Sequence, residues 1–245
     1  MPFNLVFPED CQICEAPLTH CSRIPVCDSC LRAPQPMVAE FFCAQCSTPF
    51  LNSSPLDSEG VCRLCRSGLA GFQHAWSFGE YDGPLRRLIH LFKYRKCYPL
   101  AEPLGAMLSL ALPRDIAFDV IVPMPMHWFR LWRRGFNQAA MLASVLGRRT
   151  GIPVAGNAMT RQKATAPQAG LTGAQRRLNV RAAFAVKRRH LIEGRRILLV
   201  DDVFTTGATA GTCAAVLQRA GASEVSVLTL ARADRRRGIS GRSIS

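Results

Sequence analysis

Eight cysteines arranged as four C-x-x-C pairs limit most strongly how this chain can fold. Two thiolates separated by two residues can both face one tetrahedral metal ion, and four-thiolate sites are typical of structural zinc. The four pairs therefore predict two structural zinc ions, each held by four cysteines, in a double zinc ribbon over residues 1–70. The predicted ligands are Cys11 and Cys14, Cys27 and Cys30, Cys43 and Cys46, and Cys62 and Cys65.

The four cysteine pairs can share the two zinc ions in two ways, sequential or interleaved. The intervals between pairs are 12, 12 and 15 residues, close to zinc-ribbon spacing. We favour sequential pairing over an interleaved cross-brace because each half then closes a shorter loop. Redox-active dithiols are an alternative, but no thioredoxin-like strand and helix surround any pair. The segment has few periodic apolar residues, so its folding depends on zinc, which contributes about 10–16 kcal/mol per structural site.

The charge of the chain suits an anionic partner but does not by itself establish one. Its net charge is +14, mostly from arginine, since lysine occurs only at positions 93, 96, 163 and 187. Arginine suits bidentate contacts with phosphate, so nucleic acid or a polyphosphate fits, although a basic surface without a specific partner is the simpler interpretation. The start MPFNLVFPED is unlike a secretory signal, and no apolar run reaches the roughly 18 residues of a membrane span. We therefore expect a soluble, cytoplasmic protein without membrane insertion.

Residues 71–245 alternate between strand and helix patterns. Strands are expected over 76–81, 118–122, 197–200 and 225–232, and helices over 83–96, about 100–112, 137–150 and from 208. This alternation predicts an α/β domain in which helices flank a largely parallel sheet. Ligands of such domains bind beyond the carboxyl ends of the strands, where the loops after 122 and 200 lie. The basic helix over 83–96 is simplest to interpret as a solvated face.

The stretch ILLVDDVFTTGAT, residues 197–209, predicts a binding site for a sugar phosphate. Its strand leads into a helix through a threonine- and glycine-rich turn, where free N–H groups and hydroxyls can hold a phosphate. The turn matches neither the Walker loop nor the dinucleotide fingerprint. Asp201 and Asp202 would repel phosphate, so they should accept hydrogen bonds from hydroxyls or meet a cation. A ribose 5-phosphate suits both the turn, through its phosphate, and the two aspartates, through its hydroxyls. The alternative is an acidic strand end that only caps the turn.

The same stretch resembles the binding signature of type I phosphoribosyltransferases. Together with VPMPMHWFRLWRRGFNQA, with TAPQAGLTGAQRRLNVRAAF at 165–184 and with the four cysteine pairs, it makes the chain from Cys11 to Arg232 similar to the ComF family of ComFC and GntX-type proteins. The resemblance implies a type I phosphoribosyltransferase-like fold, phosphoribosyl pyrophosphate (PRPP) as ligand, and a link to natural competence and DNA uptake or use.

Site residues follow from this resemblance. It assigns Asp201 and Asp202 to the ribose hydroxyls, and a loop at 123–125 to the pyrophosphate, whose charge Mg²⁺ would neutralise. Met124 and Met126 stand where many catalytic relatives have glycine or acidic residues. The segment 161–184 corresponds to a lid, although an exposed amphipathic helix also explains Arg176 and Arg177. The remaining residues are, for the 5-phosphate, Thr205, Thr206, Gly207, Ala208 and Thr209; for the pyrophosphate loop, Pro123, Met124, Pro125, Arg133 and Arg134; and for the lid, Arg161, Lys163, Gln168, Arg176, Arg177 and Asn179.

The predicted function is that of a PRPP-binding, phosphoribosyltransferase-like protein with an unknown acceptor. Transfer would pass through an oxocarbenium-like sugar as pyrophosphate leaves. Neither a general base nor an acceptor-binding hood is recognisable in the sequence. The main alternative is therefore a non-catalytic PRPP sensor whose zinc ribbons and basic helices bind single-stranded DNA, a competence helicase or another DNA-processing protein. A third interpretation, a zinc-ribbon nucleic-acid binder with a vestigial α/β domain, predicts no affinity for PRPP.

Overall fold

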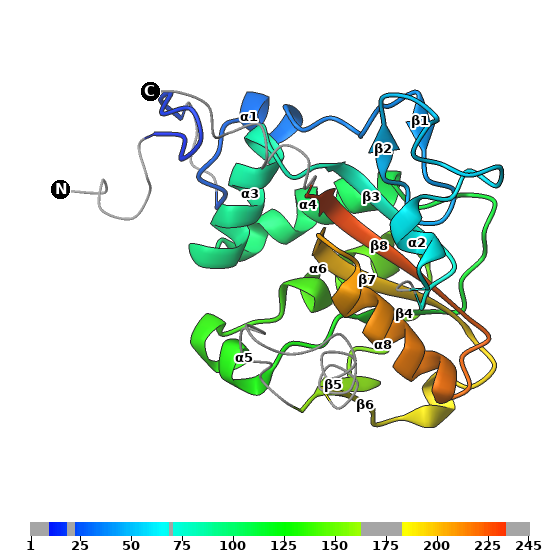
Figure 1. Cartoon of the computed structure of the whole chain (residues 1–245). Coiled ribbons are helices and arrows are strands. Elements are labelled where there is room, and N and C mark those ends of the chain that lie inside the picture. The colour runs from blue at the N-terminus through cyan, green and yellow to red at the C-terminus, as the bar shows by residue number, and fades with distance from the viewer. Residues whose placement is uncertain (1–9, 19–22, 69–70, 163–182, 234–245) are drawn as a thin grey trace, which may run out of the picture.

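A four-stranded parallel sheet forms the centre of the protein (Figure 1). In this computed structural model, residues 10–18, 23–68, 71–162 and 183–233 are described. The strand order is β3-β8-β7-β4, and all three neighbouring pairs run parallel. Strands buried on both faces are expected to be continuously apolar, as these largely are. Their bounds are β3 Ala75–Glu80, β4 Val120–Pro123, β7 Arg196–Phe204 and β8 Glu224–Arg232.

Helices cover both faces of this sheet. On one face, α3 (Gly83–Tyr94), α4 (Ala101–Leu110) and α6 (Gln138–Thr150) pack on alternate strand residues such as Leu198. On the other face, α8 (Ala208–Arg219) packs on residues such as Leu199. A small antiparallel pair, β5 (Met159–Arg161) and β6 (Phe184–Val186), lies beside α8 (Figure 1). The molecule therefore has three layers, helices, sheet and helix.

Local sequence explains where the helices of the site begin and end. Asp82 caps α3 by accepting a hydrogen bond from the Gly83 N–H, and a proline follows in the first turn. Asn137 caps α6 in the same way through the Ala140 N–H, and Gly151 ends that helix in the left-handed conformation. These caps place the starts of α3 and α6 at the carboxyl edge of the sheet.

The cysteine-rich region is built from short elements and contacts both faces of the sheet. Its first cysteine group joins the core of α3, α4 and α6, and its second joins the core that contains α8. The region therefore packs around the edge of the sheet (Figure 1). Its elements are α1 Asp28–Arg32, β1 Phe41–Phe42, β2 Pro49–Phe50 and α2 Arg63–Arg66; two 3-10 turns lie further along, at η2 Tyr98–Leu100 and η3 Arg189–Leu191.

The structure confirms the expected α/β class, the parallel sheet and the flanking helices. It also confirms the cysteine module that precedes them in the sequence. It adds α5 (Trp128–Arg134) and the β5–β6 pair, which the sequence patterns did not indicate. A boundary at residue 70 stays a prediction. Within the described ranges, every helix is too short or too polar to cross a membrane.

Candidate functional site

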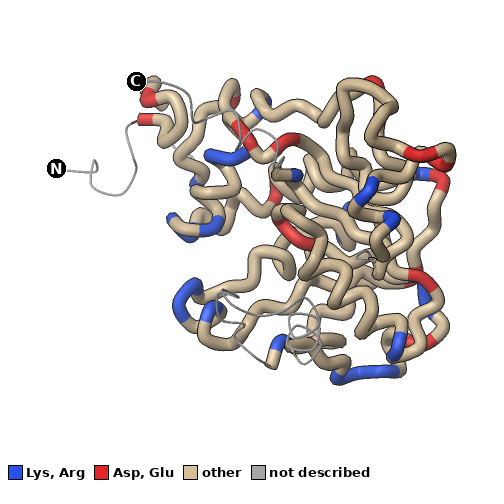
Figure 2. Tube along the Cα trace, in the orientation of Figure 1, with Lys and Arg blue, Asp and Glu red and all other residues tan. Residues whose placement is uncertain are grey.

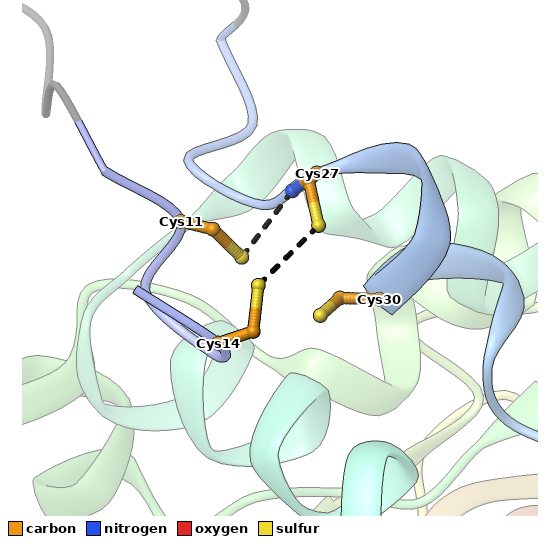
Figure 3. A group of neighbouring side chains, drawn as sticks. All are labelled: Cys11, Cys14, Cys27 and Cys30. Atoms are coloured by element: carbon orange, nitrogen blue, oxygen red, sulfur yellow. Dashed lines mark hydrogen bonds between the residues drawn. The ribbon is translucent and has the colours of Figure 1, made fainter. Parts of the chain in front are cut away.

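The first cysteine group brings four thiols together in the right arrangement for a metal ion. The sulfurs of Cys11, Cys14, Cys27 and Cys30 lie within 4.8 Å of one another and point toward a common centre (Figure 3). The N–H groups of Ile13 and Cys27 donate to Cys11 Sγ at 3.4 Å, which stabilises a thiolate. Four convergent sulfurs with amide donors fit the closed tetrahedral coordination of zinc.

The second group repeats this arrangement in a more buried place. The sulfurs of Cys43, Cys46, Cys62 and Cys65 lie within 4.8 Å of one another, and all four residues are buried. Cys43 Sγ accepts hydrogen bonds from the N–H groups of Cys46 and Cys62 at 3.5 and 3.3 Å. The thiols therefore group sequentially, the pairing that the loop-closure argument favoured, and both groups could hold zinc.

The side chains of the two acidic residues of β7 point to opposite faces of the sheet. Asp202 faces α3, where its Oδ2 lies 2.8 Å from Lys93 Nζ in an ion pair whose side chains are only 12% and 15% exposed. Asp201 faces the α8 side and lines a small pocket of about 50 Å³ with the threonine-rich loop. The carboxylates therefore approach a ligand at the strand end from two sides rather than as a side-by-side pair.

The carboxyl group of Asp201 is strongly altered by its position. Desolvation of its carboxyl, and then the negative charge of Asp202, raise the pKa of Asp201 to about 7. The Asp202 N–H, which donates to Asp201 Oδ1 at 2.9 Å, and the charges of Lys93 and Arg161 oppose this shift. Asp201 can therefore change protonation state near neutral pH, and a bound cation would favour its charged form.

The threonine-rich loop between β7 and α8 has a backbone geometry compatible with the predicted anion cradle. Gly207 adopts the left-handed conformation at φ 74° immediately before α8, so the first N–H groups of the helix point out of its end. Thr206 Oγ1 accepts from the Ala208 N–H at 3.1 Å and shapes the turn. Thr205, Ala208 and Thr209 are exposed, so the mouth of the cradle is open to a ligand.

A basic cleft of about 620 Å³ lies between α3 and α5. Figure 2 shows basic residues on both helices. Lys93, which pairs with Asp202, is one of its lining residues, so the cleft reaches the end of β7. Both predicted arginines of the pyrophosphate site lie here. The lining residues are Lys93, Tyr94, Lys96, Phe129, Arg130, Arg133 and Arg134.

The loop predicted to hold pyrophosphate offers little backbone to an anion. Pro123 and Pro125 have no N–H, and the Met124 N–H donates to the Val200 carbonyl at 2.8 Å. The Met124 side chain is buried, with its sulfur 3.3 Å from Cys213 Sγ. Any pyrophosphate near this loop must therefore be held mainly by the side chains of the basic cleft.

Arg161 lies at the base of the predicted lid. It ends β5, pairs with His127 in a parallel bridge, and places its guanidinium 5.3 Å from the centre of the Phe184 ring. Burial, and then the charge of Arg130, lower the pKa of Arg161, which Asp201 opposes. Arg161 is therefore close enough to α5 and to β7 for their charges to act on it. The other predicted lid residues, Lys163, Gln168, Arg176, Arg177 and Asn179, lie outside the described residues.

Three residues join the site that the sequence patterns did not single out. Lys93 forms the ion pair with Asp202, Arg130 lines the basic cleft, and Arg232 packs against the end of β7. The basic character of helix 83–96 was visible in the sequence, but not which of its cations faces the sheet. Arg232 stands at the end of an apolar strand, where its burial depends on the cysteine module.

Known proteins resemble the chain over most of its length. Competence protein F of Haemophilus influenzae is 32% identical over 223 residues, covering 87% of this chain and 93% of that protein. The DNA utilization protein YhgH of Escherichia coli O157:H7 is 32% identical over 239 residues, covering 93% and 99%.

Among solved structures, a Bacillus subtilis glutamine phosphoribosylpyrophosphate amidotransferase aligns with 54% of this chain and 26% of its own, at 24% identity and a TM-score of 0.39. No protein-family model matches the chain. The two relatives, each matched over more than nine-tenths of its own length, decide the assignment. The chain belongs to the ComF family, the family of competence protein F.

Proposed function

We propose that the protein binds PRPP with Mg²⁺ at the carboxyl edge of its sheet, as a phosphoribosyltransferase-like member of the ComF family. Its relatives are named for competence and for DNA utilization, and we infer the same setting for this protein. The observation that carries the proposal is one continuous edge of the sheet. There the threonine-rich loop, the two aspartates and the basic cleft follow one another.

Each part of PRPP has a chemical counterpart along this edge. The cradle at Thr205–Thr209 would bind the 5-phosphate through N–H groups and hydroxyls. Asp201 and Asp202 would accept hydrogen bonds from the ribose hydroxyls, one from each side of the strand end. Lys93 and the arginines of α5 would hold the pyrophosphate, together with Mg²⁺.

If transfer occurs, the bond between the ribose C1 and the pyrophosphate oxygen breaks and negative charge grows on the leaving pyrophosphate. Fixed cations beside that oxygen lower the barrier because they stabilise the developing charge. Lys93, Arg133 and Arg134 supply such cations from this chain. Two zinc ions in the cysteine groups would support the fold, since four-thiolate sites leave no open position for catalysis.

The direct test is calorimetric titration of PRPP with Mg²⁺ into the zinc-loaded protein. We expect binding that Asp201→Asn and Asp202→Asn each weaken at least tenfold, since each removes an acceptor for the ribose hydroxyls. Glu224→Gln is the matched control, because this exposed acid begins β8 at the opposite edge of the sheet. Equal affinities in the aspartate variants and the control would refute the ribose assignment. Pyrophosphate release with a panel of nucleobases and amines then separates an enzyme from a sensor.

A second function, binding of single-stranded DNA, is favoured by the surface of α5. Trp128 and Trp132 on this short helix are 67% and 77% exposed, and Phe129 is 45% exposed. The three arginines of the basic cleft, at positions 130, 133 and 134, lie among them in the sequence WFRLWRR. Exposed aromatic rings among arginines are the combination that stacks bases and attracts phosphates.

Fluorescence anisotropy with labelled oligo-dT tests this second function. Trp132→Ala should weaken binding by about 1–3 kcal/mol if a base stacks on the ring. Leu110→Ala is the matched control, since Leu110 is 69% exposed at the end of α4. Binding should also weaken steeply with added salt. A Trp132 variant that binds as the control does would exclude α5 as the DNA platform.

A further inference from the structure

We propose that Arg232 is a positioning residue that couples the second cysteine group to the threonine-rich loop. Whether the second cysteine group holds its metal ion then determines how well ordered the loop at 205–209 is. That group consists of Cys43, Cys46, Cys62 and Cys65. The consequence for PRPP affinity rests on the function proposed above. The coupling itself rests on contacts that link the cysteine group, Arg232, Phe204 and Gly207 in one chain.

The first link joins Arg232 to the cysteine group. Arg232 ends β8 and is only 4% exposed, so its guanidinium must find its partners inside the protein. Its Nη2 donates to the Cys46 carbonyl, and its Nη1 donates to Thr48 Oγ1 at 2.9 Å. The Thr48 hydroxyl in turn lies 2.9 Å from Cys46 Sγ. Arg232 thus holds the turn that carries one of the predicted zinc ligands.

The second link joins Arg232 to the end of β7. The guanidinium carbon lies 4.2 Å from the centre of the Phe204 ring, a close cation–π contact. Phe72 contacts the same ring edge-on, with 5.9 Å between ring centres. The Phe204 ring is therefore fixed between a cation that the cysteine module holds and a second aromatic ring.

The third link joins Phe204 to the loop. A Cβ atom placed on Gly207 would lie 2.7 Å from Phe204 Cζ, so the ring packs directly on the backbone of the turn. Residues 205–207 and the sulfur-bearing residues Cys46 and Cys65 also line one small cavity of about 50 Å³. Movement of the cysteine group can therefore reach the loop through a few packed atoms.

Electrostatics gives the coupling its dependence on metal. Four thiolates around one Zn²⁺ carry a net negative charge, which compensates the buried guanidinium of Arg232. When the ion is lost, the thiolates take up protons and become neutral, so this compensating charge disappears and the knuckle at Cys43–Cys46 is freed. The Arg232 side chain can then move away. The Phe204 ring would lose the cation–π contact that fixes it against the loop.

Hydrogen exchange of the full-length, zinc-loaded protein tests this inference without any ligand. We expect faster exchange in a peptide covering 203–212 when Arg232 is changed to Met, by about tenfold. Arg232→Lys should give an intermediate rate, since lysine keeps the charge but not the fork that reaches both acceptors. Zinc content should remain at the wild-type value in both variants, which separates positioning from loss of the module.

Removal of zinc from one cysteine group provides a second test of the same inference. Cys65→Ser should speed exchange of the same peptide, whereas Cys30→Ser in the first group should not. If Cys65→Ser does not fold, partial chelation of the wild-type protein replaces it. Unchanged loop exchange in Arg232→Met and after zinc loss would overturn the inference. With the loop result as predicted, PRPP affinity should fall about tenfold in Arg232→Met. Absence of PRPP binding by the wild-type protein would refute the proposed function alone.

Discussion

The ion pair between Lys93 and Asp202 gives the most direct quantitative prediction. Lys93→Met removes a cation 2.8 Å from a carboxylate in a place where both side chains are almost buried. Breaking a fully buried pair in this way costs about 3–5 kcal/mol, because the remaining charge is uncompensated. The residual exposure lowers that value, and we expect a loss of about 2–3 kcal/mol in the free energy of unfolding.

The opposite substitution should cost less. After Asp202→Asn, the flexible Lys93 side chain can extend into the basic cleft and keep its charge in water, so we expect a loss of about 1 kcal/mol. The double variant leaves no buried charge and should also lie about 1 kcal/mol below the wild type. The single effects should therefore not add, which is the signature of a direct interaction.

Thermal unfolding of the zinc-loaded protein measures these differences. A loss of 2–3 kcal/mol corresponds to about 4–12 °C in Tm for a chain of this size. Lys96→Met is the matched control, since this exposed lysine lines the same cleft, and it should change stability by less than about 0.5 kcal/mol. A Lys93→Met variant as stable as this control, or single effects that simply add, would refute the reasoning.

Other predictions test the metal groups, the aspartate and the loop. Elemental analysis should find two zinc ions per chain, as the two cysteine groups require, and about one in Cys65→Ser or Cys30→Ser; no zinc in reduced, unchelated protein would contradict the ribbon. Because the pKa of Asp201 is raised from 3.8 to about 7, the folded state keeps its proton longer than the unfolded state. Its contribution to stability is thus lost as pH rises from about 4 to about 7, and Asp201→Asn should remove this dependence. Calorimetry should show Mg²⁺–PRPP affinity about tenfold lower at pH 6 than at pH 8, where the carboxylate is charged; equal affinities would contradict this. Gly207→Ala should lower both Tm and PRPP affinity, since it combines a positive φ with a clash against Phe204; the control Gly156→Ala meets open space and should change neither.

The parts of the fold that local sequence determines were predictable. The strand and helix patterns between residues 75 and 232 place all four strands of the sheet, because buried parallel strands are continuously apolar. Helix α5 was missed for the opposite reason: Trp128, Phe129, Leu131 and Trp132 are exposed, so WFRLWRR has no buried apolar stripe. The signals that could have found it are its caps, His127 at the start and a left-handed Gly135 at the end.

The candidate site likewise has parts that local sequence predicts and parts that depend on distant contacts. The cysteine groups and the strand–loop–helix at 197–209 are contiguous in sequence, so spacing and turn chemistry sufficed to predict them. Lys93 and Arg232 contribute through partners 109 and 186 positions away, Asp202 and Cys46. Such contacts depend on how α3 and the cysteine module pack, which residue patterns in a single sequence do not determine.

The position of the two cysteine groups suggests why a zinc module accompanies this sheet. The first group packs on α3, where Arg87 donates to the Ile13 carbonyl at 3.0 Å, and α3 carries Lys93 to the basic cleft. The second group reaches the threonine-rich loop through Arg232. Each group therefore supports a different half of the proposed PRPP site, from opposite faces of the sheet. Loss of the first ion should weaken the pyrophosphate half, and loss of the second the 5-phosphate half, so single-group cysteine variants should lose affinity for different fragments. Ribose 5-phosphate should report on the second group and free pyrophosphate on the first. Equal losses for both fragments in both variants would contradict this division.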